Sequence, residues 1–323
     1  MNAPTATASA PKHAPKDATR AKGPIVWLDM DQRELDDAYD QLVYAPNRDQ
    51  LTKRRIINSA AVRKRIGEPL RFAYGPTPVE GLDIFPASPT QPSPAGGGGK
   101  GGGPVAIFVH GGAWRTGSAS DYSFVAEPFV RAGGNFVVLD FVSIDDTGGS
   151  LFPIAEQVRR AIGWVFRNAD KFGGDRDRLY LISHSSGSQL AGCAVTHDWS
   201  KDGLPRDLIK GATLSSGMYD LKPVRLSKRS AYVKFTDAME HELSAVRHLD
   251  RLAAPLIVSY GTYETPEFQR QTRDFAAAVK AVGKPVELLV GEAYNHFEML
   301  ETLANPYGLL GCAALAQMGL VGS

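Results

Sequence analysis

Short apolar runs recur along the chain and alternate with stretches in which apolar residues recur at helical spacing. A continuous apolar run of about four to eight residues is typical of a strand buried on both faces. Such runs predict strands at 105–109, 136–139, 179–182, 209–214, 256–260 and 286–290. Helical patterns separate most of them, at 123–132, 154–168, 187–197 and 265–282. This alternation predicts an α/β fold with a mostly parallel, doubly wound sheet flanked by helices.

The amino-terminal part of the chain follows a different pattern. Residues 27–65 have helical spacing with one polar face, and acidic residues crowd the first turns, where the helix dipole favours negative charge. Two short strands are predicted at 70–75 and 81–85. We expect residues 24–323 to form a single domain.

Two segments lack any such pattern. Residues 1–23 are rich in Ala, Pro, Thr and Lys and lack the apolar stretch of a secretory signal, which favours a disordered tail on a cytoplasmic protein. Residues 88–104 are rich in Pro and Gly and include an eight-residue run of seven glycines and a lysine. That run lacks the Gly-Lys-Ser/Thr ending of a phosphate-binding loop, so we interpret 88–104 as a flexible loop.

Composition narrows the classes of partner. The chain has 323 residues and a net charge of +1, so it carries no global field for nucleic acid or an acidic membrane. No apolar run is long enough to span a bilayer. Cys193 and Cys312 lie in apolar surroundings, which indicates two small buried side chains in a reducing compartment. No Cys/His cluster has zinc-ligand spacing, so no metal site is predicted, and a homodimer stays open.

A candidate nucleophile follows the predicted strand at 179–182. The chain reads Ser183-His-Ser-Ser-Gly187 and continues into an apolar helix. Strand, tight turn and helix in that order form the context of a nucleophile elbow, whose usual pattern is Gly-x-Ser-x-Gly. Ser185 is its centre, while Ser183 replaces the first glycine. The competing interpretation is a Ser-rich turn without chemistry, and we interpret His184 as a packing or supporting residue rather than a base.

Candidate oxyanion donors follow the strand at 105–109, where the chain reads His110-Gly-Gly-Ala-Trp114. Preorganised backbone N–H groups stabilise the negative oxygen of a tetrahedral intermediate. We assign this role to Gly111, Gly112 and the N–H of Ser186, with Ala113 as an alternative donor. His110 is expected to fix the loop by hydrogen bonding. An ordinary glycine turn is the competing interpretation.

The base and the acid are expected on loops after the last two predicted strands. His296 follows the strand at 286–290 and can accept the Ser185 proton. Glu264 follows the strand at 256–260 and is the acid that we expect to orient the imidazole. The competing interpretation is a carboxylate that interacts with the dipole at a helix start, which Glu267 fits better. Asp220, after the strand at 209–214, is the alternative acid.

Together these segments resemble the kynurenine formamidase-like branch of the α/β-hydrolases, close to the hormone-sensitive-lipase-like esterases. The matching pieces include His110–Trp114, Ser183–Leu190, Ser216–Leu221, Glu264–Phe268 and Asn295–Phe297. The family often has Asp where Glu264 stands, and its first elbow glycine is missing here.

The resemblance implies an α/β-hydrolase domain that cleaves a small ester, formamide or aryl amide without metal or cofactor. It also implies that Trp114 flanks the substrate pocket and that Tyr263 or Phe297 contributes an aromatic wall. Three functions remain open: a formamidase or amidase, a short-chain carboxylesterase, and a noncatalytic binding protein on a hydrolase fold. The third would be expected to have a broken triad, whereas a serine, an acid and a histidine all stand in the expected places.

Overall fold

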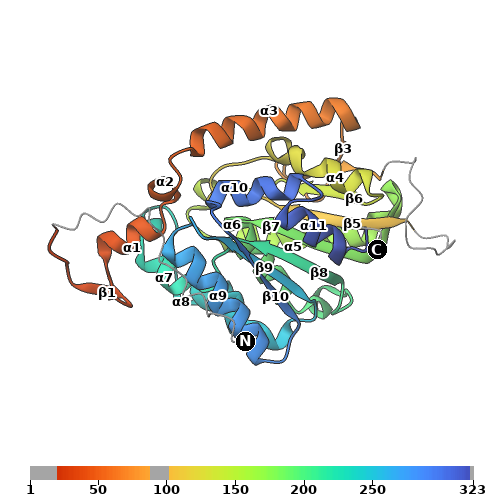
Figure 1. Cartoon of the computed structure of the whole chain (residues 1–323). Helices are drawn as coiled ribbons and strands as arrows, with labels where there is room; N and C mark the ends of the chain where they lie inside the picture. The colour runs from red at the N-terminus through yellow and green to blue at the C-terminus, as the bar shows by residue number, and fades with distance from the viewer. Residues whose placement is uncertain (1–19, 88–101, 321–323) are drawn as a thin grey trace, which may run out of the picture.

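The computed structural model describes residues 20–87 and 102–320. Among them, one eight-stranded sheet with the order β10-β9-β8-β7-β5-β6-β4-β3 forms the centre of the molecule (Figure 1). Its strands are β3 (Leu70–Ala73), β4 (Gly81–Phe85), β5 (Gly103–Val109), β6 (Asn135–Leu139), β7 (Gly174–His184), β8 (Ile209–Ser215), β9 (Leu256–Gly261) and β10 (Val286–Gly291). The pairs β3–β4 and β4–β6 are antiparallel and the other five pairs are parallel. The predicted α/β class and mostly parallel sheet are therefore confirmed.

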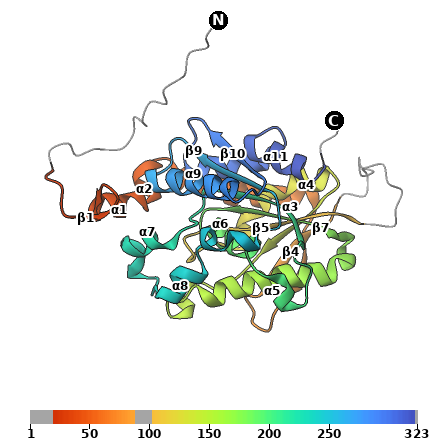
Figure 2. The same cartoon turned by 90° about the horizontal axis from the view of Figure 1, so that it is seen from below.

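Side chains of the central strands alternate between two cores, one on each face of the sheet. In β7, Leu179 and Leu181 belong to one core and Ile182 to the other. In the first core, the sheet packs against α5 (Phe152–Asn168), α6 (Ser186–Val195) and α9 (Pro266–Ala281). In the second core, the sheet packs against α4 (Ala126–Arg131), α10 (His296–Glu301) and α11 (Leu309–Gln317). In Figure 2, α5 lies below the sheet while α4 and α11 lie above it.

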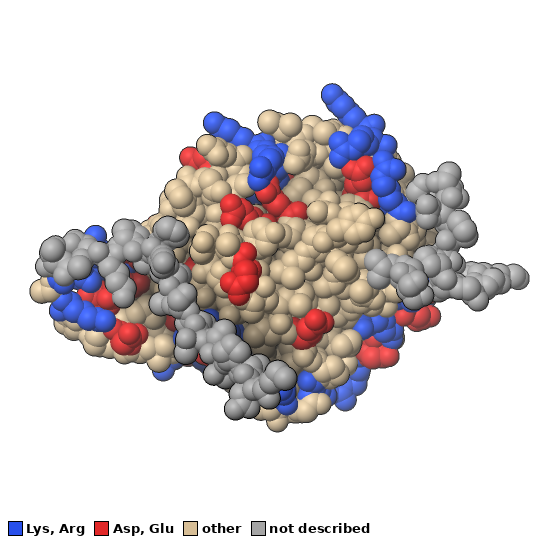
Figure 3. Space-filling view, viewed as in Figure 1, with Lys and Arg blue, Asp and Glu red and all other residues tan. Residues whose placement is uncertain are grey.

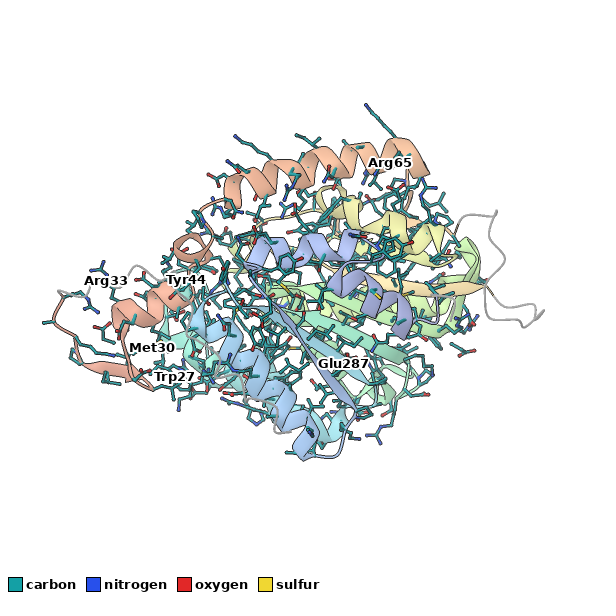
Figure 4. All side chains as sticks on the ribbon, in the orientation of Figure 1. Trp27, Met30, Arg33, Tyr44, Arg65 and Glu287 are labelled. Atoms are coloured by element: carbon teal, nitrogen blue, oxygen red, sulfur yellow. The ribbon has the colours of Figure 1, made fainter. Side chains whose placement is uncertain are left out.

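The remaining elements are short or amino-terminal. They are β1 (Ile25–Trp27), β2 (Met30–Asp31), α1 (Gln32–Ala38), α2 (Gln41–Tyr44), α3 (Arg48–Ile66), α7 (Leu221–Leu226), α8 (Asp237–Glu242) and the 3₁₀ turns η1 (Ala119–Val125), η2 (Ile144–Thr147), η3 (Ala169–Phe172), η4 (Trp199–Asp202), η5 (Lys228–Ala231), η6 (Ala245–Arg251) and η7 (Thr302–Ala304). The prediction of one helical stretch over 27–65 was therefore wrong. A hairpin and three separate helices occupy this segment, and Figure 4 labels Trp27 and Met30 in the hairpin.

Polar caps and a proline divide this segment. The Asp31 side chain accepts a hydrogen bond from the N–H of Glu34, and Glu34 reciprocates, which forms a capping box that starts α1. The Asp40 side chain accepts from the N–H of Leu42 and starts α2. Pro46 disfavours helical backbone at the residue before it, so α3 begins only after it. Of the acids attributed to one helix start, Asp31 and Glu34 form the cap of α1, whereas a further acid, Asp40, caps α2.

The helix α3 is strongly basic and lies across the top of Figure 1, where the space-filling view in Figure 3 shows lysine and arginine gathered. Two of its arginines are paired with acids of the helices beneath. Arg65 forms an ion pair of 2.5 Å with Glu127 of α4, and Arg54 pairs with Glu301 of α10. These contacts attach α3 to the second core.

Other predictions from composition have mixed outcomes. Residues 1–19 and 88–101 lie outside the described residues, and β5 begins at Gly103, inside the predicted loop 88–104. Cys193 is buried as predicted, but Cys312 is exposed because it lies on an outward face of α11. Both cysteines are free thiols. None of the helices in 20–87 and 102–320 is both long and apolar enough to cross a membrane.

Truncating the centre of the sheet should destabilise the fold. Leu181 lies on β7 between β5 and β8 and is fully buried, so we expect Leu181→Ala to lower the free energy of unfolding by about 2–5 kcal/mol. Ile57→Ala on α3, where the side chain is 67% exposed, should change it by less than about 0.5 kcal/mol. Urea unfolding measures both. Equal free energies of unfolding for the two variants would contradict the burial of Leu181 at the centre of the sheet.

Candidate active site

Ser185 lies at the junction between β7 and α6, in a backbone conformation that non-glycine residues rarely adopt. Its φ is 59° and its ψ is −128°. The Ser185 N–H donates to the carbonyl oxygen of Ser215 at 3.0 Å, which ties the turn to the end of β8. The chain thus reverses from strand to helix within one residue and leaves the Ser185 hydroxyl at the carboxyl end of β7.

Small residues permit this turn. A Cβ atom on Gly187 would lie 2.1 Å from the carbonyl oxygen of Val109, and one on Gly111 would lie 2.8 Å from the Ser185 Cβ. The start of α6 and the loop after β5 therefore pass the elbow in backbone contact. This explains the glycine that closes the elbow motif.

The serine at the first elbow position is accommodated by hydrogen bonds. The hydroxyl oxygens of Ser183 and Ser188 are 2.9 Å apart, and the Ser188 hydroxyl donates to the Ser215 carbonyl at 2.7 Å. Ser183 is buried, so its hydroxyl would carry a desolvation cost without such a partner. The departure from glycine is therefore compatible with the strand–helix junction.

The structure brings Ser185, His296 and Glu264 together. The His296 Nε2 lies 2.8 Å from the Ser185 Oγ, and its Nδ1 lies 2.7 Å from the Glu264 Oε2. A carboxylate accepts hydrogen bonds, so Nδ1 is the donor toward Glu264 and Nε2 is free to accept the serine proton. All three side chains are buried. The arrangement can transfer a proton from the hydroxyl to the imidazole while Glu264 balances the charge.

The second oxygen of Glu264 has partners of its own. Oε1 accepts hydrogen bonds from the Ser216 hydroxyl at 2.6 Å and from the Gly261 N–H at 2.7 Å. These donors offset the cost of burying the polar oxygens of a carboxylate away from water. Ser216 was not predicted as a site residue, although it begins the segment Ser216–Leu221 noted in the sequence. Its positive φ of 55° at the end of β8 is a structural signal that the sequence does not show.

Asp220, the alternative acid, lies at the start of α7. Asp220 caps α7 by accepting from the Lys222 N–H at 3.1 Å, and its Oδ1 also accepts from Arg247 at 3.3 Å. Among the described residues it makes no hydrogen bond with His296. Geometry therefore favours Glu264 as the partner of the imidazole.

His184 contacts the main chain and the ring of His296. Its Nε2 lies 2.8 Å from the His296 carbonyl oxygen, and the two rings are 4.5 Å apart. Burial, with the neighbouring His296 as a second cause, keeps the pKa of His184 well below its ordinary value. The ring is therefore neutral, with Nε2 as the donor. Phe268 and Phe297 complete the surroundings, with their rings nearly perpendicular to that of His296 at 5.1 and 5.4 Å.

The loop after β5 presents backbone N–H groups beside the elbow. Gly112, Ala113 and Trp114 have positive φ angles of 121°, 55° and 63°. The Trp114 N–H donates to the Ser186 hydroxyl at 3.3 Å, which joins the loop to α6. Within the part of the chain that the structure describes, the N–H groups of Gly112 and Ala113 have no acceptor. Such groups can bind an oxyanion, and this role stays a prediction for Gly111, Gly112 and Ser186.

His110 braces this loop. Its Nδ1 donates to the Gly111 carbonyl at 2.7 Å, and its ring is stacked between Tyr122 and Phe141 at centroid distances of 5.0 and 4.3 Å. Burial lowers the pKa of His110, so the ring is neutral. The hydrogen bond agrees with the expected loop-fixing role.

The three predicted substrate-contact residues have different environments. Trp114 is buried, and its indole N–H donates to Gln189 at 3.1 Å. Tyr263 is 39% exposed on the loop after β9, and Phe297 is half-buried next to His296. Substrate contact by these three side chains remains a prediction.

Potential metal ligands gather away from the serine. His241, Glu242 and His248 each bring one ligand atom within 4.8 Å of the others. The His248 Nε2 is already bonded to the His241 carbonyl at 2.9 Å, and His241 and Glu242 are exposed. None of these three side chains hydrogen-bonds to Ser185 or His296, so the serine chemistry does not draw on them.

Neutral His184 should make stability depend on pH. The unfolded chain protonates this imidazole below about pH 6.5, whereas the folded protein does not, so stability is lost as the pH falls. His184→Gln keeps an N–H donor but does not titrate. Between about pH 7.5 and 5.5, we expect the free energy of unfolding to fall less in His184→Gln than in the wild type. The difference should be up to about 1 kcal/mol per pH unit.

Urea unfolding at both pH values measures this difference. His110 has the same sign of shift and is present in both proteins, so it cancels in the comparison. Identical pH dependence in wild type and His184→Gln would contradict a neutral, buried His184.

Comparisons with known proteins agree with an α/β-hydrolase fold. The BD-FAE family model matches residues 94–216, which contain the loop after β5 and the elbow. The chain is 28% identical over 305 residues to a kynurenine formamidase of Danio rerio, covering 91% of this chain and 98% of that protein. A putative thioesterase structure from a Silicibacter species has a TM-score of 0.71 and 22% identity, and covers 85% of this chain and 96% of its own. Esterase 2 of Thermogutta terrifontis, solved with propionate bound, has a TM-score of 0.63 and 20% identity, over 80% and 97%.

Proposed function

We propose that this chain, which has an α/β-hydrolase fold and is distantly related to kynurenine formamidases, is a serine hydrolase that acts through an acyl-enzyme at Ser185. Its substrate is a small ester, formamide or aryl amide. The observation that carries the proposal is the continuous hydrogen-bond chain from Ser185 through His296 to Glu264, with distances of 2.8 and 2.7 Å. Both distances fall within the range expected for proton transfer.

In the acylation half of the reaction, Ser185 is the nucleophile, His296 transfers the proton and backbone N–H groups stabilise the oxyanion. His296 accepts the proton from Ser185 as the serine oxygen forms a bond to the acyl carbon. The acyl oxygen becomes negative and is stabilised by the N–H groups of Gly111, Gly112 and Ser186. The bond from the acyl carbon to the leaving oxygen or nitrogen then breaks, and His296 passes its proton to that atom.

Deacylation repeats the sequence with water. His296 takes a proton from water, the hydroxide oxygen attacks the acyl carbon, and the bond to Ser185 breaks. The proton returns to the Ser185 oxygen and the carboxylic acid leaves. The Glu264 carboxylate stabilises the imidazolium in both halves.

Esters and formamides fit the same groups, and the chain is similar to a kynurenine formamidase in sequence and to an esterase in fold. We therefore propose a formamidase-like activity as the first candidate and a short-chain carboxylesterase as the second. Measuring kcat/KM for N-formylkynurenine, 4-nitrophenyl acetate and an anilide ranks the two candidate activities. A noncatalytic binding protein would hydrolyse none of the three.

Labelling with a fluorophosphonate tests the nucleophile. The wild-type protein should label with one equivalent, and Ser185→Ala should lose the label because no activated hydroxyl remains. Ser200→Ala removes an exposed serine and should label like the wild type. Intact-protein mass spectrometry measures the adduct. A wild-type protein that does not label, or a Ser185→Ala protein that does, would contradict the proposal.

Two matched carboxylate variants test the acid. Glu264→Gln should lower kcat by about 10³–10⁴-fold, since the amide can hold the imidazole in the wrong tautomer. Asp220→Asn should change kcat by less than about threefold, because Asp220 only caps α7 and contacts Arg247. Steady-state kinetics of both folded variants give the comparison. A larger loss in Asp220→Asn would overturn the assignment.

A further inference from the structure

Three potential metal ligands meet where α8 ends and η6 bends. His241 and Glu242 are the last two residues of α8, and His248 lies in η6. Each of the three side chains brings one ligand atom within 4.8 Å of the others. Met239 of α8 and Leu249 of η6 belong to the first core, and α8 lies on the same side of the sheet as α5 (Figure 2). Both elements that carry the ligands are therefore packed against the domain.

The backbone of η6 directs His248 toward the end of α8. His248 has a φ of −130° and a ψ of 28°, which interrupts the helical turn. Its Nε2 donates to the His241 carbonyl oxygen at 2.9 Å, and the two rings lie 5.3 Å apart at an angle of 79°. A kink and a main-chain hydrogen bond thus hold the His248 ring beside the two residues that end α8.

This hydrogen bond leaves the other nitrogen of His248 free to bind a ligand. In the neutral ring Nε2 carries the proton and Nδ1 holds the lone pair, and none of the described residues hydrogen-bonds to Nδ1. His248 is only 5% exposed, so its ring has little freedom to turn away. Histidines that bind metals usually donate their other N–H to a carbonyl or carboxylate oxygen, which fixes the tautomer and orients the ring. His248 has this arrangement.

The other two ligands already lie close to each other. The His241 Nδ1 is 3.0 Å from the Glu242 Oε1, and across 20–87 and 102–320 the second oxygen of Glu242 has no hydrogen-bond partner. Ligand atoms at tetrahedral angles, each about 2.0–2.2 Å from zinc, lie about 3.3–3.6 Å apart. Both side chains are exposed, so small rotations about their own bonds can complete such a set around Nδ1 of His248.

We propose that His241, Glu242 and His248 bind a zinc ion that links α8 to η6. Two imidazoles and a carboxylate form a donor set that zinc prefers, and water would take the fourth position. The spacing of cysteines and histidines predicted no zinc site, because one ligand is a glutamate and a kink brings His248 back to α8. The cluster makes no hydrogen bond to the serine or its base, so the ion takes no part in the hydrolysis.

The ion would close a short loop that contains Leu243. The Leu243 carbonyl oxygen accepts hydrogen bonds from the Gln189 Nε2 at 2.9 Å and the Cys193 Sγ at 3.3 Å. Gln189 in turn accepts from the indole N–H of Trp114 at 3.1 Å. Zinc would therefore fix the segment that contacts α6. Because only the folded chain brings the three ligands together, zinc should also raise the thermal stability of the protein.

Calorimetric titration of Zn²⁺ into the full chain without a purification tag tests the site. Cys312→Ser is the starting protein, because this exposed thiol would itself bind zinc. We expect one ion per chain and a higher Tm with zinc than with a chelator. Glu242→Gln and His248→Gln should each weaken binding by at least about 100-fold, since removal of even a supporting partner costs about 10–100-fold. Both variants should also lose the increase in Tm.

His197→Gln is the matched control. His197 lies 2.7 Å from Asp202, which makes another histidine–carboxylate pair, but in the described chain it belongs to no three-ligand cluster. This variant should bind zinc like the starting protein. Circular dichroism checks that every variant folds, and the exposed Glu242 keeps the test valid if His248→Gln does not fold.

Absence of zinc binding in the starting protein would overturn the proposal, as would undiminished binding in Glu242→Gln. Binding that is lost only in His296→Gln would place the ion at the proposed catalytic histidine and would contradict the proposal as well. These readouts do not depend on hydrolysis, so they stand apart from the test of the proposed function.

Discussion

The left-handed backbone of Ser185 is the constraint on which the rest of the site depends. A residue with φ of 59° between β7 and α6 reverses the chain so abruptly that the neighbouring backbones come into contact. The Ser215 carbonyl holds the turn, and Gly187 and Gly111 leave room for it. Strain of this kind persists only when the surrounding structure overdetermines it. The parallel sheet, with β5 and β8 on either side of β7, provides those surroundings.

Buried polar groups around this turn are matched to specific partners. Glu264 uses one oxygen for His296 and the other for Ser216 and Gly261, so the imidazole is oriented by a carboxylate that is itself fixed. His184 stays neutral and supports the main chain of His296. In a low-dielectric site each of these arrangements has more effect on reactivity than it would at the surface.

The sequence predicted the sheet well because strands buried on both faces appear as continuous apolar runs. It also nominated Ser185, Glu264 and His296, since each follows a predicted strand, and the structure places them in contact across up to 111 residues of sequence. It failed over 27–65, where local caps and Pro46 divide what spacing alone suggests is one helix. Ser216 was missed because its role depends on a partner 48 residues away, which no local pattern reveals.

The central claim is that Ser185 becomes acylated during turnover, and rapid-quench mass spectrometry of a 4-nitrophenyl ester reaction tests it most directly. The account predicts that protein quenched during the burst carries one acyl group, that this group maps to the peptide containing Ser185, and that its formation keeps pace with the first equivalent of nitrophenolate. Turnover without a covalent acyl group, or an acyl group on another residue, would contradict the account.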